Sequence, residues 1–293
     1  MTNPYLALAN QGKNSWWRYA IAIAIILFFY QVVGAIPMVA LSIALDLDDN
    51  PETQLNLETL QFEGVNPLLP YLAINGLLIG LLIGLLIAVY GLHRRRLITL
   101  ITPSDRINWQ RIFQGFGFYF LLISLATLVG EVLLGRTIEL TLDIPQFLIF
   151  LPIALIVTPL QTSAEELFFR GYLMQGLALK ASNSWIPIVG SSVLFMLPHL
   201  LNPEAQSGLL IMALLYFFLG AFLAFITVKD QSLELALGVH AANNLFVVLV
   251  LNYANSALPS PSVFTASQLN PLASLVSLVG VAAIFCFLLF GRR

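Results

Sequence analysis

Three charged residues lie close together in a segment that is otherwise apolar enough to cross a membrane. Glu165, Glu166 and Arg170 belong to the stretch TSAEELFFRGYLMQG, which begins at Thr162. A charged side chain at the centre of a bilayer costs about 2.5–3.5 kcal/mol on insertion scales. Glu166 and Arg170 are four residues apart, so on a helix they share a face and can pair. Glu165 is turned about 100° away, which leaves one carboxylate without a partner in its own segment.

Other polar side chains also lie where lipid disfavours them. His199 ends the apolar run VGSSVLFMLPH, and His240 and Asn244 are four residues apart in GVHAANNLF. At 1.5 Å of rise per residue, Glu165, His199, His240 and Asn244 all fall about 12–22 Å of helix from the same side of the membrane. We therefore expect these four residues to form one site inside the membrane. Asn243, which lies about 100° from the His240–Asn244 face, is expected to have at most a minor part.

The chemistry of these residue types suits hydrolysis of a peptide bond. A carboxylate beside an imidazole can take a proton from water and so generate a nucleophile. A second imidazole and an asparagine amide can donate hydrogen bonds to a developing oxyanion, each worth about 2.7–4 kcal/mol in known hydrolases. The set Glu165, His199 and His240 can instead hold zinc with an open position for water. The residue types alone do not separate the two mechanisms.

Membrane helices must position these residues. Of the 293 residues, 59% are hydrophobic and only 10% are charged, whereas soluble domains contain about 25% charged residues. The chain is therefore an integral membrane protein. A net charge of −2 with scattered basic residues argues against a nucleic-acid partner. The single cysteine, Cys286, can form neither an internal disulfide nor a thiolate metal site.

The apolar segments predict an all-α, polytopic transmembrane bundle. A helix needs about 20 apolar residues to cross the hydrocarbon core, and by that length we predict eight spans: 19–45, 68–91, 112–134, 147–171, 186–201, 208–228, 233–252 and 270–291. The fourth is expected to continue as helix to about Lys180. Gly76, Gly80 and Gly84 lie four residues apart in the second span, a spacing that lets another helix approach closely.

Basic residues orient the bundle. Cytoplasmic loops of membrane proteins carry an excess of lysine and arginine. If both termini are cytoplasmic, nearly all basic residues collect on that side, and the far side keeps only Arg136 and an acidic loop after the first span. We predict both termini in the cytoplasm and a bacterial inner membrane as the location. The run from His93 to Arg96 is expected to be a solvated positive anchor at the membrane surface.

Three short motifs resemble those of a known family. EELFFR from Glu165 to Arg170 matches EExxxR, FMLPH ending at His199 matches FxxxH, and HAANN from His240 to Asn244 matches HxxxN. Their order and spacing resemble the CAAX protease and bacteriocin-processing family, also called Abi, which contains the type II CAAX prenyl endopeptidases. The resemblance covers about residues 145–252. It divides the chain into three N-terminal spans (1–144), a catalytic core of four spans (145–252) and an outside loop with a final helix (253–293).

The resemblance implies an intramembrane endopeptidase with a role for each motif residue. Glu165 is expected to be the base that activates water, and His199 to help hold that water. His240 and Asn244 are expected to form the oxyanion side, while the Glu166–Arg170 pair orients the site. A glutamate-dependent mechanism without a metal is favoured, with zinc as the alternative.

The expected substrate is a peptide or membrane-anchored protein that is cut near the cytoplasmic leaflet. A prenylated substrate does not follow from the motifs. Two other functions use the same residues. One is a membrane scaffold or bacteriocin self-immunity protein that binds in the cavity without cleaving. The other is a transporter, since intramembrane Glu and His side chains can relay protons, although the sequence has no inverted repeat to support it.

Overall fold

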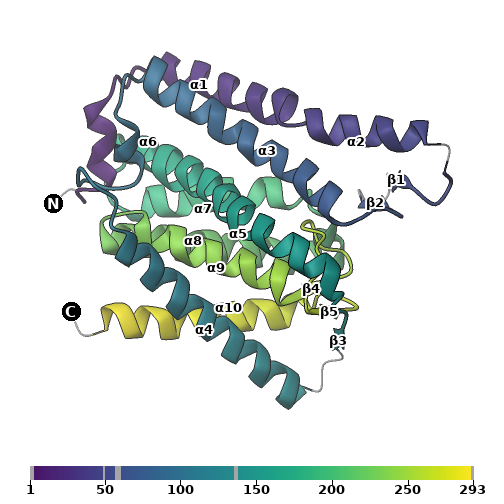
Figure 1. The fold of residues 1–293 in the computed structure, drawn as a ribbon. Helices are drawn as coiled ribbons and strands as arrows, with labels where there is room; N and C mark the ends of the chain where they lie inside the picture. The colour runs from purple at the N-terminus through teal and green to yellow at the C-terminus, as the bar shows by residue number, and fades with distance from the viewer. Residues whose placement is uncertain (1–2, 49, 57–60, 135–137, 292–293) are drawn as a thin grey trace.

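The computed structural model describes residues 3–48, 50–56, 61–134 and 138–291, and helices dominate it (Figure 1). The α-helices are α1 (Trp16–Phe28), α2 (Ile36–Leu47), α3 (Leu68–Ile87), α4 (Trp109–Leu134), α5 (Ile144–Glu166), α6 (Gln175–Ala178), α7 (Trp185–His199), α8 (Leu209–Asp230), α9 (Glu234–Leu249) and α10 (Pro271–Phe290). Three π-helical segments, η2 (Phe29–Val33), η3 (Ala88–Leu92) and η5 (Leu167–Met174), continue α-helices without a break in the chain direction. The short strands are β1 (Gln54–Asn56), β2 (Gln61–Glu63), β3 (Ile138–Leu140), β4 (Leu251–Tyr253) and β5 (Phe264–Ala266).

The predicted helical membrane bundle is confirmed. Among the described residues, six helices are long and apolar enough to cross a membrane: 16–47, 68–92, 109–130, 144–178, 209–230 and 271–290. The two other predicted spans, 186–201 and 233–252, are apolar helices of only 15 and 16 residues, α7 and α9. Both stop early because the chain turns into other structure: α7 into a short 3-10 segment, and α9 into β4. Such incomplete crossings are tolerated where protein surrounds the backbone or lines a cavity.

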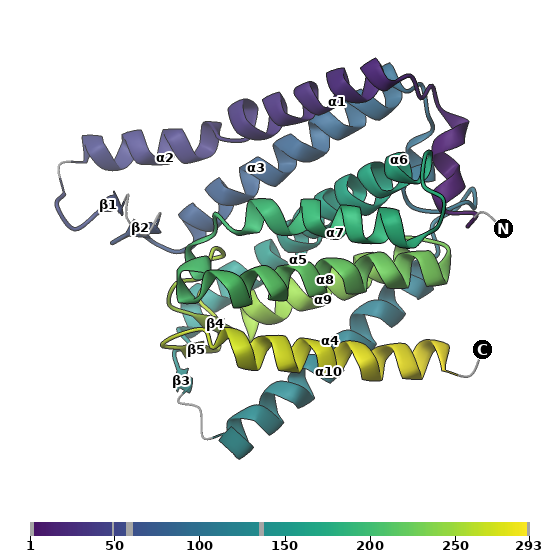
Figure 2. The ribbon, with the colours of Figure 1, turned by 180° about the vertical axis from the view of Figure 1, so that it is seen from behind.

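The two ends of the bundle differ. Figures 1 and 2 show both termini at one end and the strands at the other. We call these the terminus end and the strand end. At the strand end β1 pairs with β2, and a second sheet has the order β3-β5-β4, in which β5 is antiparallel to β3 and parallel to β4. Both termini lie at the same end, as the predicted orientation requires. That this end faces the cytoplasm stays a prediction.

Glycines bring neighbouring helices into close contact. The glycine face predicted for the second span is where α3 meets α1 and η2. A Cβ atom at Gly80 would lie 2.3 Å from the carbonyl oxygen of Phe29, so only glycine fits. At the centre of the molecule, a Cβ atom at Gly238 on α9 would lie 2.0 Å from the carbonyl oxygen of Ile112 on α4. Because α4, α5 and α8 all pack against α9, this helix is buried along most of its length and holds His240 in a fixed place.

The basic run at the terminus end is not the solvated anchor that its sequence predicts. His93 and Arg95 are buried, at 2% and 5% exposure, and only the two other arginines of the run are exposed. The N-terminal segment and η5 cover them and supply partners. His93 donates from Nδ1 to the carbonyl of Lys13 (2.8 Å), and the hydroxyl of Tyr172 lies 2.9 Å from its Nε2. Burial lowers the pKa of His93 below its ordinary value.

Candidate active site

The charged motif lies where the helix widens. Glu165 and Glu166 end α5, and the chain continues directly into the π-helix η5, which contains Arg170. Helix then extends to Ala178, close to the predicted end near Lys180. The sequence predicted a regular helix here, whereas the structure has a π-helical segment of eight residues. Such segments are rare and occur frequently at functional sites.

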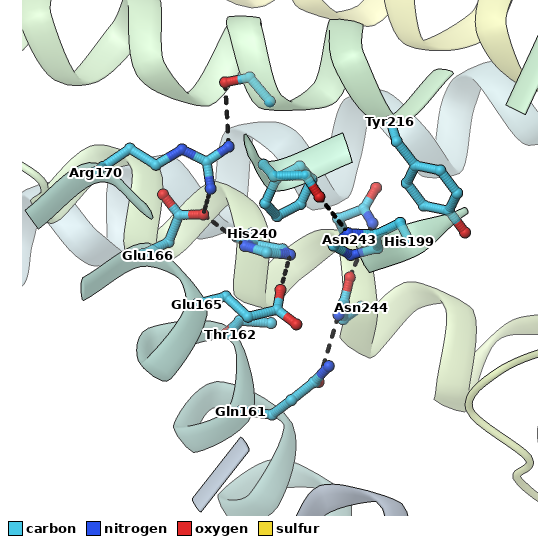
Figure 3. Close-up of polar contacts among 12 residues, drawn as sticks. Gln161, Thr162, Glu165, Glu166, Arg170, His199, Tyr216, His240, Asn243 and Asn244 are labelled. Carbon is cyan, nitrogen blue, oxygen red and sulfur yellow. Dashed lines mark hydrogen bonds and ion pairs between the residues drawn. The ribbon is translucent and has the colours of Figure 1, made fainter. Parts of the chain in front are cut away.

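Glu166 and Arg170 form the predicted pair. Both side chains are fully buried, and Arg170 Nη1 lies 2.6 Å from Glu166 Oε1. Arg170 also donates to the carbonyl of Gly220 on α8 at 3.1 Å. The same Glu166 oxygen accepts a second hydrogen bond, 2.8 Å long, from Nδ1 of His240 (Figure 3). The ion pair therefore anchors α9 and α8 to the end of α5.

His240 lies between the two adjacent carboxylates. A carboxylate oxygen accepts hydrogen bonds, so Nδ1 of His240 carries the proton that it donates to Glu166. The other ring nitrogen, Nε2, lies 3.5 Å from Oε2 of Glu165. The resemblance to the family had suggested that His199 assists Glu165 and that His240 belongs to the oxyanion side. In the structure it is His240 that lies beside Glu165.

His199 is fixed from two sides at the end of α7. Its Nδ1 donates to the carbonyl of Phe195 at 2.7 Å, because a carbonyl can only accept. Its ring lies between those of Phe195 and Tyr216, with centroids 4.3 Å and 4.6 Å away. The Tyr216 hydroxyl in turn donates to the buried carboxylate of Glu204 at 2.6 Å. In this tautomer Nε2 of His199 is an acceptor.

Asn244 belongs to a chain of hydrogen-bonded polar side chains, most of which the motifs do not predict (Figure 3). The Tyr119 hydroxyl donates to the side-chain oxygen of Asn243 at 3.2 Å. Asn243 donates to the side-chain oxygen of Asn244 at 3.0 Å, and Asn244 donates to that of Gln161 at 3.4 Å. Gln161 lies four residues before Glu165, so its spacing on the same helical face is the signal that could have identified it.

One cavity connects these groups. It has a volume of about 2080 Å³, and its walls are mostly apolar. The four predicted site residues, Glu165, His199, His240 and Asn244, all line it. Glu166 and Arg170 do not, since they lie behind His240 in the packed interior. The arrangement thus joins a carboxylate, two imidazoles and an amide around one space that is large enough for a peptide segment.

Comparisons with known proteins agree with this geometry. Residues 144–246, from the start of α5 into α9, match a family described as type II CAAX prenyl endopeptidase Rce1-like. The chain belongs to the CAAX protease and bacteriocin-processing family. Over 277 residues it is 31% identical to a Bacillus subtilis (strain 168) protein described as "Uncharacterized protein YyaK". The aligned region covers 94% of this chain and 91% of that protein. No solved structure matches the chain significantly.

Glu165, His199 and His240, the three residues of the zinc alternative, all line the cavity of this CAAX protease family member. Among the described residues, no three His, Cys, Asp or Glu side chains are grouped as metal ligands. His240 uses Nδ1 on Glu166. The contacts of His199 are instead with Phe195 and Tyr216. Both histidines thus use Nδ1 on the protein, as metal-bound histidines also do, so the mechanism without a metal stays a prediction.

Proposed function

We propose that the protein is an intramembrane endopeptidase that hydrolyses a peptide bond in a membrane-associated protein or peptide, with Glu165 as the base that activates water. The observation that carries this proposal is the position of His240 between Glu165 and the Glu166–Arg170 pair. A carboxylate whose neighbouring imidazole is held by a second, neutralised carboxylate is suited to moving one proton back and forth.

The directions of the hydrogen bonds indicate where the proton that is transferred in the reaction can lie. Glu166 accepts a hydrogen bond from Nδ1 of His240, and Arg170 balances the negative charge of Glu166. Glu165 Oε2 and His240 Nε2 then face each other at 3.5 Å, and one proton can reside on either. When Glu165 is ionised, it accepts a proton from a cavity water as the water oxygen attacks the substrate carbonyl carbon. The proton then passes to the leaving nitrogen as the carbon–nitrogen bond breaks.

The hydrogen bonds of His199 and Asn244 indicate a different role for each side chain. Nε2 of neutral His199 is an acceptor, so it orients the attacking water by accepting one of its hydrogens. Asn244 uses its side-chain oxygen on Asn243, which directs its amide nitrogen into the site. That nitrogen has one hydrogen for Gln161 and a second for the developing oxyanion. A donor of this kind is worth about 2.7–4 kcal/mol of transition-state stabilisation.

The proposal is tested by comparing newly formed protein N-termini in the membranes of cells that produce the wild type or Glu165→Gln. We expect a set of cleavage products that requires Glu165, while the variant reaches the membrane in equal amount. Glu139→Gln, which changes an exposed carboxylate on β3, is the matched control and should retain every product. Identical N-termini in wild type and Glu165→Gln would overturn the proposal and favour a non-catalytic scaffold.

The mechanism has its own test. Once a product is known, its precursor can be incubated with purified protein in the presence of a chelator. We expect cleavage to continue. Cleavage that stops and is restored by zinc would refute the metal-free mechanism while leaving the assignment as a protease intact.

A further inference from the structure

For the residues that the structure describes, the lining of the cavity extends to the strand end of the bundle and does not reach the terminus end. Its lining includes β4 residues Asn252 and Tyr253, the end of β5 at Ala266, and the first turn of α10 from Asn270, all at the strand end. Within the described part of the chain, no lining residue comes from the segments at the terminus end, which are 3–22, 82–118, 174–193, 220–239 and 285–291. His240 is the lining residue of α9 nearest the terminus end, and the lining continues from it to the strands.

The terminus end is closed by a buried polar layer. Tyr5, from the N-terminal segment, is fully buried, and its hydroxyl donates to the carbonyl of Leu100 at 2.7 Å. Gln175, directly after η5, is also fully buried and donates to the carbonyl of Thr99 at 3.1 Å. Arg95 donates to both Gln175 and Thr99. These groups use their hydrogen bonds on one another, so they separate Arg170 and the site from water at this end.

The charge distribution assigns the two ends to the two sides of the membrane. Among the described residues, the loops at the terminus end contain most lysines and arginines, whereas those at the strand end are rich in aspartate and glutamate and contain neither lysine nor arginine. An excess of basic residues marks the cytoplasmic side. With this predicted orientation, the strand end of the cavity lies on the non-cytoplasmic side, opposite to the expectation of cleavage near the cytoplasmic leaflet.

We propose that the site receives its substrate from the non-cytoplasmic side of the membrane. The segment that is cut then belongs to an exported peptide or to the outer part of a membrane protein. This identification of a substrate class rests on the proposed proteolytic function, whereas the side of access does not. Asn252 and Glu204 add polar groups to the cavity lining near the strand end.

Cysteine labelling tests the side of access directly. The single cysteine, Cys286, lies outside the cavity lining and is first changed to serine. Ser277→Cys then reports on the cavity, since Ser277 lines it from α10. Ser267→Cys marks an exposed position at the strand end of the cavity, and Ser182→Cys marks an exposed position at the terminus end. Each variant is treated with a membrane-impermeant cationic methanethiosulfonate, in intact cells and in inverted membrane vesicles.

We expect the Ser277→Cys and Ser267→Cys variants to react in intact cells, and the Ser182→Cys variant to react only in inverted vesicles. Reaction of Ser277→Cys from the cytoplasmic face, or from neither face, would overturn the proposal. Thr127→Cys, which lines the same cavity from α4, is a second probe if Ser277→Cys does not accumulate. Repeating the labelling in a Glu165→Gln background separates the two proposals, because access requires no catalysis.

Discussion

Replacing Arg170 with methionine removes the cation that neutralises Glu166 in the centre of the bundle. Both side chains are fully buried and 2.6 Å apart, so Arg170→Met leaves a buried carboxylate without its counter-charge. Removing one partner of a buried ion pair costs about 3–5 kcal/mol. We expect the free energy of unfolding of Arg170→Met to fall by about that amount, measured by denaturant titration of the purified protein in micelles.

The double variant Glu166→Gln/Arg170→Met separates stability from chemistry. Replacing both members of a buried pair by neutral groups is often neutral or stabilising, by about 1–4 kcal/mol, so the double variant should recover most of the lost stability. Its glutamine still accepts from His240, but the charge that holds the imidazolium is gone. Partners that orient metal-bound histidines change affinity or activity by about 10–100-fold, and we expect a loss of cleavage in the same range when this partner of His240 is changed.

An exposed ion pair supplies the control. Arg96 and Asp105 lie 2.9 Å apart, with side chains 67% and 81% exposed. Exposed pairs contribute about 0–1 kcal/mol, so Arg96→Met should leave the unfolding free energy nearly unchanged. A double variant of the buried pair that is no more stable than Arg170→Met would refute the reasoning, because the two effects would then simply add.

Three further predictions concern the surrounding contacts. Asn243→Ala removes the donor that orients Asn244, and we expect a lower kcat with little change in the KM for the substrate. A rise in KM as large as the fall in kcat would contradict this role. Tyr216→Phe keeps the ring beside His199 but deletes its hydroxyl. Glu204 then loses one hydrogen bond and keeps those from Asn202 and Ala257, so the free energy of unfolding should fall by about 1.5–3 kcal/mol. Nitrogen NMR of the three histidines should still find His199 protonated at Nδ1. Because burial lowers the pKa of His93, the unfolded chain binds its proton first, so stability should fall as pH drops below about 6.5; His93→Gln should flatten this dependence, and a persistent slope would point to another group.

Much of the fold could be predicted because lipid imposes simple rules. Long apolar runs identify the spans, and the glycines of the second span identify a close helix contact. The short helices α7 and α9 could not be predicted in this way. The helices end at His199 and Leu249, but the residues that follow are also apolar. The apolar stretch in the sequence is therefore longer than each helix. The burial of Arg95 was hidden for a similar reason, because its partners Thr99 and Gln175 lie in other elements.

The site residues were predictable, but their partners were not. A spacing of four identifies the Glu166–Arg170 pair, since both members share one helix. The contact of His240 with both carboxylates depends on how α9 is rotated about its axis relative to α5. That rotation is set by close packing such as Gly238 against α4, which no motif spacing encodes. Gln161 was missed because a neutral amide costs little in an apolar segment and attracts less attention than a charge.

Two adjacent glutamates therefore have different surroundings for a packing reason. At the junction of α5 and η5 the two side chains leave the helix in different directions. Glu166 points into the interior, is fully buried and faces Arg170, whereas Glu165 is 8% exposed and lines the cavity. His240 contacts both carboxylates. Glu166 therefore fixes the orientation of the imidazole, and the imidazole in turn lies beside Glu165. The residue type is the same at both positions, and only the neighbours supplied by α9 and η5 distinguish the carboxylate that holds the site from the one that is free to exchange a proton.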